Sequence, residues 1–360
     1  MIVNAGRDPA WVCAAAPTAA VRDFHRSLPG YAPTRLADLP DLARAYGVAR
    51  LFAKDESNRF GLPAFKALGA SWAIHRALRE RTAGPVTVVT ATDGNHGRAV
   101  ARFARQFGHR AGIFVPDGVH PAAVRAIRDE GADVTHVPGD YDTAVRAAAR
   151  AAGPAGTLLV QDMAWDGYER VPGWIVDGYG TLFAELDEQL RGHGITHPDV
   201  LVVPAGVGSL LQAALTHYRG AGAPPGTAVL SVEPRSAACV LASVAAGHPV
   251  TVATGVTSMA GLNCGTVSSL AWPYIRRGLD ACVAVDDAEA AAAARRLARH
   301  GVDAGPCGAA PLAGLAAGLA AGLAAGQTGG GPVGAALGLT PASTVVLLVT
   351  EGAAANPAAS

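Results

Sequence analysis

Short, continuous apolar runs alternate with Ala- and Arg-rich stretches along most of this chain, and this alternation limits the fold more than any other feature. The runs are rich in β-branched residues and lack a regular apolar–polar alternation, so they predict strands that are buried on both faces. Helical stretches between successive strands are typical of parallel sheets covered by helices. We therefore expect an α/β fold. The predicted strands are 86–90, 111–115, 134–137, 157–160, 200–203, 228–232, 281–285 and 344–350, and the predicted helices are 67–81, 97–106, 121–130, 142–150, 176–190, 209–218, 236–246, 288–299 and 311–325.

A chain of 360 residues is long enough for about two domains of ordinary size. Two sheet systems fit the predicted strands better than a single sheet does. The Pro- and Gly-containing stretches at 153–156, 192–198 and 220–226 have the length of ordinary α/β connections, so none of them marks a domain boundary. The Ala- and Gly-rich repetition at 312–326 predicts a helix whose small residues allow close packing.

Composition argues against several classes of protein. Half of the residues are apolar, and acidic and basic residues number 29 each, which argues against a disordered chain and against a basic surface for nucleic acid. Residues 304–350 are uncharged, but Ala, Gly and Pro dominate there, so a buried helix and a buried strand are favoured over a membrane span. Five scattered cysteines without a C-x-x-C pair, and a start without a signal-like pattern, predict a cytoplasmic protein without a disulfide framework.

The chain contains only two lysines, Lys54 and Lys66, against 27 arginines. Such a bias replaces lysine with arginine wherever only a positive charge is needed. Arginine stays protonated, however, and cannot do the covalent chemistry of a primary amine. Both lysines are therefore candidates for a reaction that needs an amine. For Lys54, survival by chance stays open as the alternative.

Lys66 follows Phe65 in a segment, 54–69, in which polar residues and glycines precede a predicted helix. A lysine at a helix start beside an aromatic ring is poorly solvated and lies near the positive end of the helix dipole. Both effects disfavour the ammonium form, so we expect a lowered pKa, as in lysines that form Schiff bases. On position alone, a lysine at a helix start is more often a solvated surface residue.

Polar residues follow the strand predicted at 86–90, in the segment 90–98 (Thr-Ala-Thr-Asp-Gly-Asn-His-Gly-Arg). The carboxyl end of a parallel strand, just before a helix, is where open α/β sheets bind ligands. A plain strand-to-helix turn with Asp93 or Asn95 as the N-cap is the alternative. That alternative accounts for one of these polar residues and not for the whole group.

A glycine-containing loop, 204–210 (Pro-Ala-Gly-Val-Gly-Ser-Leu), follows the strand predicted at 200–203. Its glycines let the backbone approach an anion, and N–H groups at a helix start bind phosphate. As a dinucleotide fingerprint the loop fails, because the third glycine would fall at Leu211. The loop therefore predicts a phosphate cup for a smaller cofactor. The last predicted strand ends in Thr-Glu-Gly at 350–352, which by itself indicates a strand terminus.

In combination and in this order, these segments resemble the fold-type II family of pyridoxal-phosphate enzymes, and within it the diaminopropionate ammonia-lyases. The resemblance covers roughly residues 50–352. The Phe-Lys segment, the Thr-Asp-Gly-Asn-His-Gly loop and the Gln-Asp, Trp and Gly-Tyr pattern at 161–168 are specific to this branch. Generic dehydratases of the fold usually carry Ser-Ala-Gly-Asn-His at the second motif. Further family-like stretches are 91–99, 174–182, 205–210, 232–234, 258–265 and 350–352.

The resemblance implies a fold like that of the tryptophan synthase β chain, with two open parallel-sheet α/β domains and pyridoxal 5'-phosphate between them. It implies a large cofactor-binding domain, 1–65 with 180–360, and a smaller substrate or lid domain, 66–179. It also implies a homodimer that acts on a small amino acid. No metal site is expected, because the histidines show no H-x-x-x-H or H-E-x-x-H spacing.

The functional residues of the family can be carried over one by one. Lys66 is expected to form the Schiff base with the cofactor, Phe65 to pack near its ring, and Asn95 to bond its phenolic oxygen. Thr350 is expected to face the pyridine nitrogen, where a hydroxyl does not enforce a pyridinium and so favours elimination over transamination. The phosphate is expected to bind Gly206, Val207, Gly208, Ser209 and Leu210.

Asp93 stands where dehydratases place a small residue, and in the resembling lyases this aspartate is a second base opposite the lysine. One base on each side would let either substrate enantiomer lose its α-proton. Asp162 is expected to be a supporting carboxylate that binds the distal amine of the substrate, and a turn-capping role is its alternative. The implied reaction is α,β-elimination of 2,3-diaminopropionate to pyruvate and ammonia.

The sequence departs from the family at 303–308 (Asp-Ala-Gly-Pro-Cys-Gly), where a Ser-Gly-Glu-Ser-Gly type segment is usual. The glutamate is missing and Cys307 stands nearby, so a related β-substituted alanine is an alternative substrate. A serine/threonine dehydratase or a β-replacement enzyme on the same fold is the second interpretation. A non-catalytic relative is disfavoured by the joint presence of Lys66, Asn95, the glycine loop and Thr350.

Overall fold

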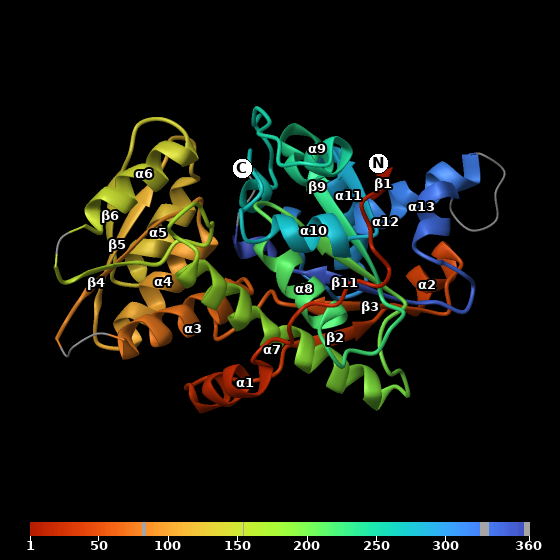
Figure 1. Cartoon of the computed structure of the whole chain (residues 1–360), viewed down its shortest axis with the longest axis horizontal. Coiled ribbons are helices and arrows are strands. Elements are labelled where there is room, and N and C mark those ends of the chain that lie inside the picture. Colours follow the sequence, from red (N-terminus) through yellow and green to blue (C-terminus); the bar gives the residue numbers. More distant parts are fainter. Residues whose placement is uncertain (81–83, 154, 325–330, 356–360) are drawn as a thin grey trace.

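The computed structural model describes residues 1–80, 84–153, 155–324 and 331–355, which form two lobes (Figure 1). The strands are β1 (Ile2–Val3), β2 (Arg35–Asp38), β3 (Arg50–Asp55), β4 (Thr87–Ala91), β5 (Arg110–Val115), β6 (Asp133–His136), β7 (Thr157–Leu159), β8 (Val200–Pro204), β9 (Ala228–Pro234), β10 (Ala281–Val285) and β11 (Thr344–Val349). The α-helices are α1 (Thr18–Ser27), α2 (Pro40–Tyr46), α3 (Lys66–Arg79), α4 (Asn95–Gln106), α5 (Pro121–Asp129), α6 (Tyr141–Ala151), α7 (Arg170–Gly192), α8 (Ser209–Arg219), α9 (Cys239–Ala246), α10 (Trp272–Gly278), α11 (Asp287–Ala298), α12 (Pro306–Ala324) and α13 (Gly331–Ala336).

The larger lobe is built on a seven-stranded sheet with the order β1-β10-β9-β8-β11-β3-β2. Its five inner strands are parallel, and β1 and β2 run antiparallel at the two edges. Along β8, Val200 and Val202 pack with residues of α12, whereas Leu201 and Val203 pack with residues of α8 on the opposite face. Both faces of this sheet are therefore buried, as the continuous apolar runs predict.

The smaller lobe is built on a four-stranded, fully parallel sheet with the order β6-β5-β4-β7. Val88 of β4 packs with residues of α4, and the neighbouring Val89 packs with residues of α6. Each lobe is thus a largely parallel sheet covered by helices on both faces, and the predicted α/β fold class is confirmed in both lobes.

Each predicted strand and helix is present, with differences at the ends. The helix predicted from residue 176 begins at Arg170, and the one predicted from 311 begins at Pro306. The last residues predicted for the helices 67–81 and 311–325, Arg81 and Ala325, lie outside the described residues. The prediction missed β1, β2 and β3, because β1 and β2 are short edge strands and β3 carries the charged residues Lys54 and Asp55. It also missed the helices α1, α2, α10 and α13.

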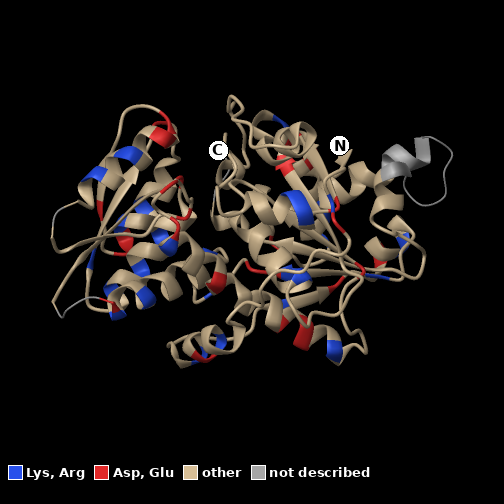
Figure 2. Cartoon of the chain, in the orientation of Figure 1, with Lys and Arg blue, Asp and Glu red and all other residues tan. Residues whose placement is uncertain are grey.

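Charges of both signs are spread over both lobes (Figure 2). In the described part of the chain, no helix combines the length and the apolar character that crossing a membrane requires. The uncharged segment 304–350 contributes α12, which packs against β8, β9, β10 and β11, and then β11 itself, which is fully buried. The interpretation of this segment as a buried helix and a buried strand is therefore confirmed for its described residues.

Two glycines let α3 and α7 cross closely where the lobes meet (Figure 1). A Cβ atom on Gly178 would lie 2.6 Å from the carbonyl oxygen of Leu68, and one on Gly69 would lie 2.6 Å from Cε1 of Tyr179. The division into 1–65 with 180–360 and 66–179 stays a proposal, and its second boundary falls inside α7.

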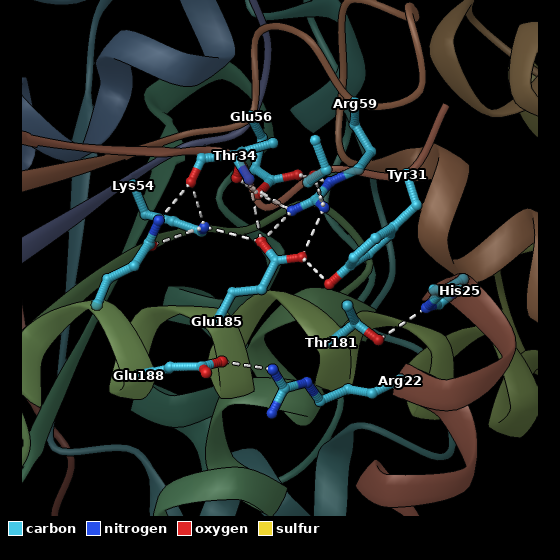
Figure 3. A network of polar contacts seen from close by, with 12 residues as sticks. Arg22, His25, Tyr31, Thr34, Lys54, Glu56, Arg59, Thr181, Glu185 and Glu188 are labelled. Atoms are coloured by element: carbon cyan, nitrogen blue, oxygen red, sulfur yellow. Dashed lines mark hydrogen bonds and ion pairs between the residues drawn. The ribbon is translucent and has the colours of Figure 1, made fainter. Parts of the chain in front are cut away.

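A buried ion cluster of Lys54, Glu56, Arg59 and Glu185 fixes the segment that precedes α3 (Figure 3). Glu185 of α7 accepts hydrogen bonds from Lys54 Nζ at 2.9 Å and from Arg59 Nη2 at 2.8 Å, and Arg59 also pairs with Glu56 at 2.6 Å. The cluster therefore ties β3, the following loop and α7 together. A buried pair of this kind persists because each charge has a partner.

The ammonium of Lys54 is fully used within this cluster. It donates to Thr34 O at 2.8 Å, to Glu185 Oε2 at 2.9 Å and to Gln189 Oε1 at 3.0 Å. Three acceptors around one compact nitrogen suit an ammonium and not the planar fork of a guanidinium. These three hydrogen bonds explain why position 54 is a lysine. Neither survival by chance nor a covalent reaction of the amine is needed to account for it.

We predict that Gly178→Ala lowers the free energy of unfolding by ~1–3 kcal/mol, because the added Cβ would overlap the backbone of α3. Urea denaturation measures this change. The control is Gly173→Ala in the same helix, where the added Cβ meets no atom within 4 Å. There the better helix propensity of alanine should raise the free energy of unfolding by up to ~1 kcal/mol. Equal effects of the two changes would contradict the close crossing.

We predict that Lys54→Met lowers the free energy of unfolding by ~3 kcal/mol, because it leaves part of the negative charge of the cluster without its buried partner. The matched control is Arg44→Met, which breaks an exposed ion pair with Asp41 and should cost under ~1 kcal/mol. Both values come from urea denaturation. A loss for Lys54→Met no larger than that for Arg44→Met would contradict a stabilising role for the cluster.

Candidate active site

A cavity of about 850 Å³, part of it open to solvent, lies where the carboxyl ends of strands from both lobes meet. β4 leads into the loop with Asp93 and Asn95, β7 into Asp162, β8 into the glycine loop, and β11 into Thr350. The α/β topology therefore brings segments that are far apart in the sequence to one place.

All residues that the sequence predicts for the site line this one cavity. They are Phe65, Lys66, Asp93, Asn95, Asp162, Gly206, Val207, Gly208, Ser209, Leu210 and Thr350. Sequence reasoning did not single out Thr92, Tyr141, Cys264 and Glu351, which also line it. Tyr141 and Glu351 both come soon after the ends of strands, β6 and β11, and that position is the signal that could have found them.

Lys66 and Asp162 form an ion pair inside the cavity, with 2.6 Å between Nζ and Oδ2. Burial alone would lower the pKa of Lys66, as predicted, but the carboxylate of Asp162 outweighs burial and raises it. The predicted lowering of the pKa is therefore wrong, because the partner comes from a residue that is distant in the sequence. Burial would raise the pKa of Asp162 in turn, and the Lys66 ammonium outweighs it and holds this pKa below its usual value.

The carboxylate of Asp162 faces side chains and does not act as a simple turn cap. Its Oδ1 accepts from Tyr141 Oη at 3.4 Å and from Gln161 Nε2 at 3.3 Å. Its backbone carbonyl accepts from Ser209 Oγ at 2.8 Å, which joins the smaller lobe to the glycine loop. These contacts fix the carboxylate beside Lys66.

Asp93 lies half-buried at the start of α4. Burial, together with the nearby Asp162 carboxylate, raises the pKa of Asp93 to about 7 against the opposing effect of Lys66. The turn itself is capped by Thr92, whose Oγ1 accepts from Gly94 N at 2.9 Å and from Gly97 N at 3.0 Å. The alternative in which Asp93 or Asn95 serves as the N-cap is therefore wrong, and the side chain of Asp93 is left to the cavity.

Asn95 and Glu351 connect the two lobes across the cavity. Asn95 Nδ2 donates to Glu351 Oε2 at 2.6 Å, and Glu351 Oε1 accepts from the backbone N–H of Cys307 at 3.1 Å. The segment 303–308 lacks the expected glutamate, but the carboxylate of Glu351 contacts this segment through the N–H of Cys307. His96 supports the same loop, since its Nε2 donates to Val160 O at 2.8 Å.

The glycine loop has the shape of an anion cradle. Gly208 has a φ of +96°, and a Cβ on Gly206 would lie 3.0 Å from Cys264 Sγ, so both positions need glycine. The loop runs into the start of α8, where the first N–H groups have no acceptor within the helix. Thr350 is nearly fully buried in the cavity wall. An amine, an anion cradle and a hydroxyl in one cavity fit an aldehyde cofactor with a phosphate and a ring nitrogen.

A metal centre is not apparent: in the ranges that the structure covers, no three His, Cys, Asp or Glu residues are grouped so that they could hold an ion.

Comparison with known proteins agrees with this chemistry. The family profile "Pyridoxal-phosphate dependent enzyme" matches residues 27–350. Diaminopropionate ammonia-lyase of Escherichia coli (strain K12) is 38% identical over 293 residues, which are 77% of this chain and 73% of that protein. A biosynthetic L-threonine dehydratase of Mycobacterium leprae is 30% identical over 333 residues, covering 91% of this chain and 70% of the relative.

Solved structures show the same fold over nearly the whole chain. The crystal structure of the Escherichia coli diaminopropionate ammonia-lyase in complex with D-serine superposes with a TM-score of 0.88 at 32% identity, covering 98% of this chain and 93% of that one. The predicted family, fold and cofactor are thereby confirmed. The chain belongs to the pyridoxal-phosphate dependent enzymes, and within them to the ammonia-lyases that carry out β-elimination.

Proposed function

We propose that this enzyme eliminates ammonia from 2,3-diaminopropionate, or from a closely related β-substituted alanine, to give pyruvate. The observation that carries the proposal is the Lys66–Asp162 ion pair with Asp93 beside it. If Lys66 binds the cofactor covalently, its charge is withdrawn from Asp162. The buried carboxylate then needs a new cation, and the β-ammonium of a diamino acid supplies one.

The chain's own residues have distinct parts in this proposal. Lys66 holds the cofactor, Phe65 packs beside its ring and Asn95 bonds its phenolic oxygen. The loop residues Gly206, Val207, Gly208, Ser209 and Leu210 bind the phosphate, and the Thr350 hydroxyl faces the ring nitrogen. When bound, the cofactor supplies the electron sink for the negative charge at the α-carbon.

Proton movement falls to two groups in the cavity. Lys66 and Asp93 each remove the α-proton, one from each enantiomer. For Asp93 the raised pKa suits this role, because a base works best with a pKa near the working pH. Asp162 orients the β-ammonium as it leaves. A small amino acid is also what relatives act on or bind, since the superposed Escherichia coli structure holds D-serine.

A serine/threonine dehydratase or a β-replacement enzyme is the second candidate, favoured by the similarity to threonine dehydratases. A hydroxyl leaving group would bring no charge to Asp162, so this candidate leaves that carboxylate unpaired. The expectations of a homodimer and of a cytoplasmic location stay predictions.

We predict that borohydride treatment of the cofactor-bound enzyme attaches the pyridoxyl group to Lys66 and leaves Lys54 unmodified. The chain has no third lysine, so peptide mapping gives an unambiguous result. Lys66→Ala should lose the visible absorbance of the bound cofactor and remain folded by circular dichroism. A pyridoxyl group elsewhere, or none, would overturn the proposed role of Lys66.

We predict that Asp93→Asn lowers kcat/KM for the D-enantiomer of 2,3-diaminopropionate by ~10²–10⁴-fold and affects the L-enantiomer far less, because only one face loses its base. Release of pyruvate and ammonia measures both rates. In the unchanged enzyme, kcat/KM for the D-enantiomer should rise with pH as Asp93 ionises, at a pH above that of an ordinary carboxyl because burial raises its pKa, and this rise should disappear in the variant. Asp166→Asn, at an exposed loop position, is the control and should leave both rates unchanged. Equal losses for both enantiomers would contradict two-sided proton removal.

A further inference from the structure

The hydroxyl of Tyr179 is a buried polar group without a partner. Tyr179 lies in α7, its side chain is 0% exposed, and its oxygen makes no hydrogen bond to any described residue. Buried hydroxyls in folded proteins are nearly always bonded, because leaving one unbonded costs free energy. The exception therefore needs an explanation from its surroundings.

The ring of Tyr179 is held against the segment that carries Lys66. Its centroid lies 4.7 Å from that of Phe65, and Gly69 lies beneath it so closely that a Cβ there would come within 2.6 Å of Cε1 and 2.9 Å of Cζ. Lys66 Nζ in turn lies 5.4 Å from the centroid of Phe65. The packing leaves the phenol no route to solvent, and Tyr179 and Lys66 both lie near the ring of Phe65.

The Lys66 ammonium and the Tyr179 phenol influence each other's pKa. Burial raises the pKa of Tyr179 to about 12, with the Lys66 ammonium acting in the opposite direction. The phenol therefore stays protonated at neutral pH and can both donate and accept a hydrogen bond. In this structure the Lys66 ammonium donates to Asp162 Oδ2 at 2.6 Å and not to the phenol.

We propose that Tyr179 is a positioning residue for Lys66, whose side-chain nitrogen bonds the Tyr179 hydroxyl whenever it turns away from Asp162. This inference rests on the proposed function, in which Lys66 releases the cofactor and moves a proton in each cycle. A lysine held by a carboxylate is kept as an ammonium and is a poor base. A neutral phenol accepts from the ammonium or donates to the amine, so it holds the nitrogen in place in both protonation states.

The low lysine count makes the test direct. Lysine labelled with ¹³C at Cε gives two side-chain signals in the full-length chain, and Lys66→Arg identifies the one from Lys66. The pH titration of this signal is recorded after the cofactor has been removed with hydroxylamine. It gives the pKa of Lys66 independently of enzyme activity.

With Asp162 in place, Tyr179→Phe should shift the pKa of Lys66 by less than ~0.3 unit, because the carboxylate holds the ammonium there. In the Asp162→Asn background the same change should lower it by more, about 1–2 units, because the nitrogen then depends on the phenol. Folding should be unaffected, since the hydroxyl that is removed has no partner to lose. In the cofactor-bound enzyme, kcat should fall ~10-fold at nearly constant KM.

Tyr218→Phe is the matched control. It removes the same atom from another buried tyrosine, whose hydroxyl donates to Asp187 at 3.1 Å, and it should leave the pKa of Lys66 unchanged. A pKa that stays within ~0.2 unit on Tyr179→Phe in the Asp162→Asn background, or an equal shift there with Tyr218→Phe, would overturn the inference. Borohydride mapping of the unchanged enzyme separates this outcome from failure of the proposed function, because it reports the role of Lys66 alone.

Discussion

The shared carboxylate of Glu185 is the interaction on which the placement of the site depends. It holds Lys54 of β3 and Arg59 of the following loop against α7, with all three side chains removed from water. Inside the protein such charges interact strongly and cannot separate without leaving one of them unpaired. The loop that ends in Phe65 and Lys66 is therefore fixed at its start by ionic contacts. It is fixed at its end by the backbone, where Phe65 N donates to Thr350 O at 3.1 Å. The reactive amine is thus placed by contacts outside the cavity.

The cavity itself depends on both lobes, because neither contributes a complete set of groups. The smaller lobe brings Asp93, Asn95 and Asp162, and the larger lobe brings the glycine loop and Thr350. Two hydrogen bonds join the sets, from Asn95 to Glu351 and from Ser209 to the carbonyl of Asp162. A shift of one lobe against the other would lengthen both at once. The lengths of these two hydrogen bonds therefore depend on how the lobes are placed relative to each other. The close crossing of α3 and α7 restricts that placement.

The sequence could predict what depends on local pattern. Buried parallel strands and their helices follow from apolar runs, and glycines and polar residues at the strand ends mark the cavity. What it could not supply are contacts between distant residues. The pKa of Lys66 was expected to fall because its neighbours in sequence are apolar, and it rises because Asp162 lies beside it in space. Lys54 is a candidate amine because the chain has only two lysines, and its acceptors on α7 are more than a hundred residues away in the sequence. The short edge strands β1 and β2 carry too few residues to show a pattern.

The electrostatics of the cavity also link substrate binding to proton removal. The Asp162 carboxylate is one cause of the raised pKa of Asp93, and Lys66 acts against it. In the proposed function, a covalent bond to the cofactor would turn Lys66 away from both carboxylates, and Asp93 would then be favoured in its protonated form, which is not a base. A substrate that carries a β-ammonium restores the positive charge near both carboxylates and lowers the pKa of Asp93 again. The second base would then ionise when a diamino acid binds and stay protonated with serine. The positive charge of the β-ammonium would thus both select the substrate and convert Asp93 into its basic form.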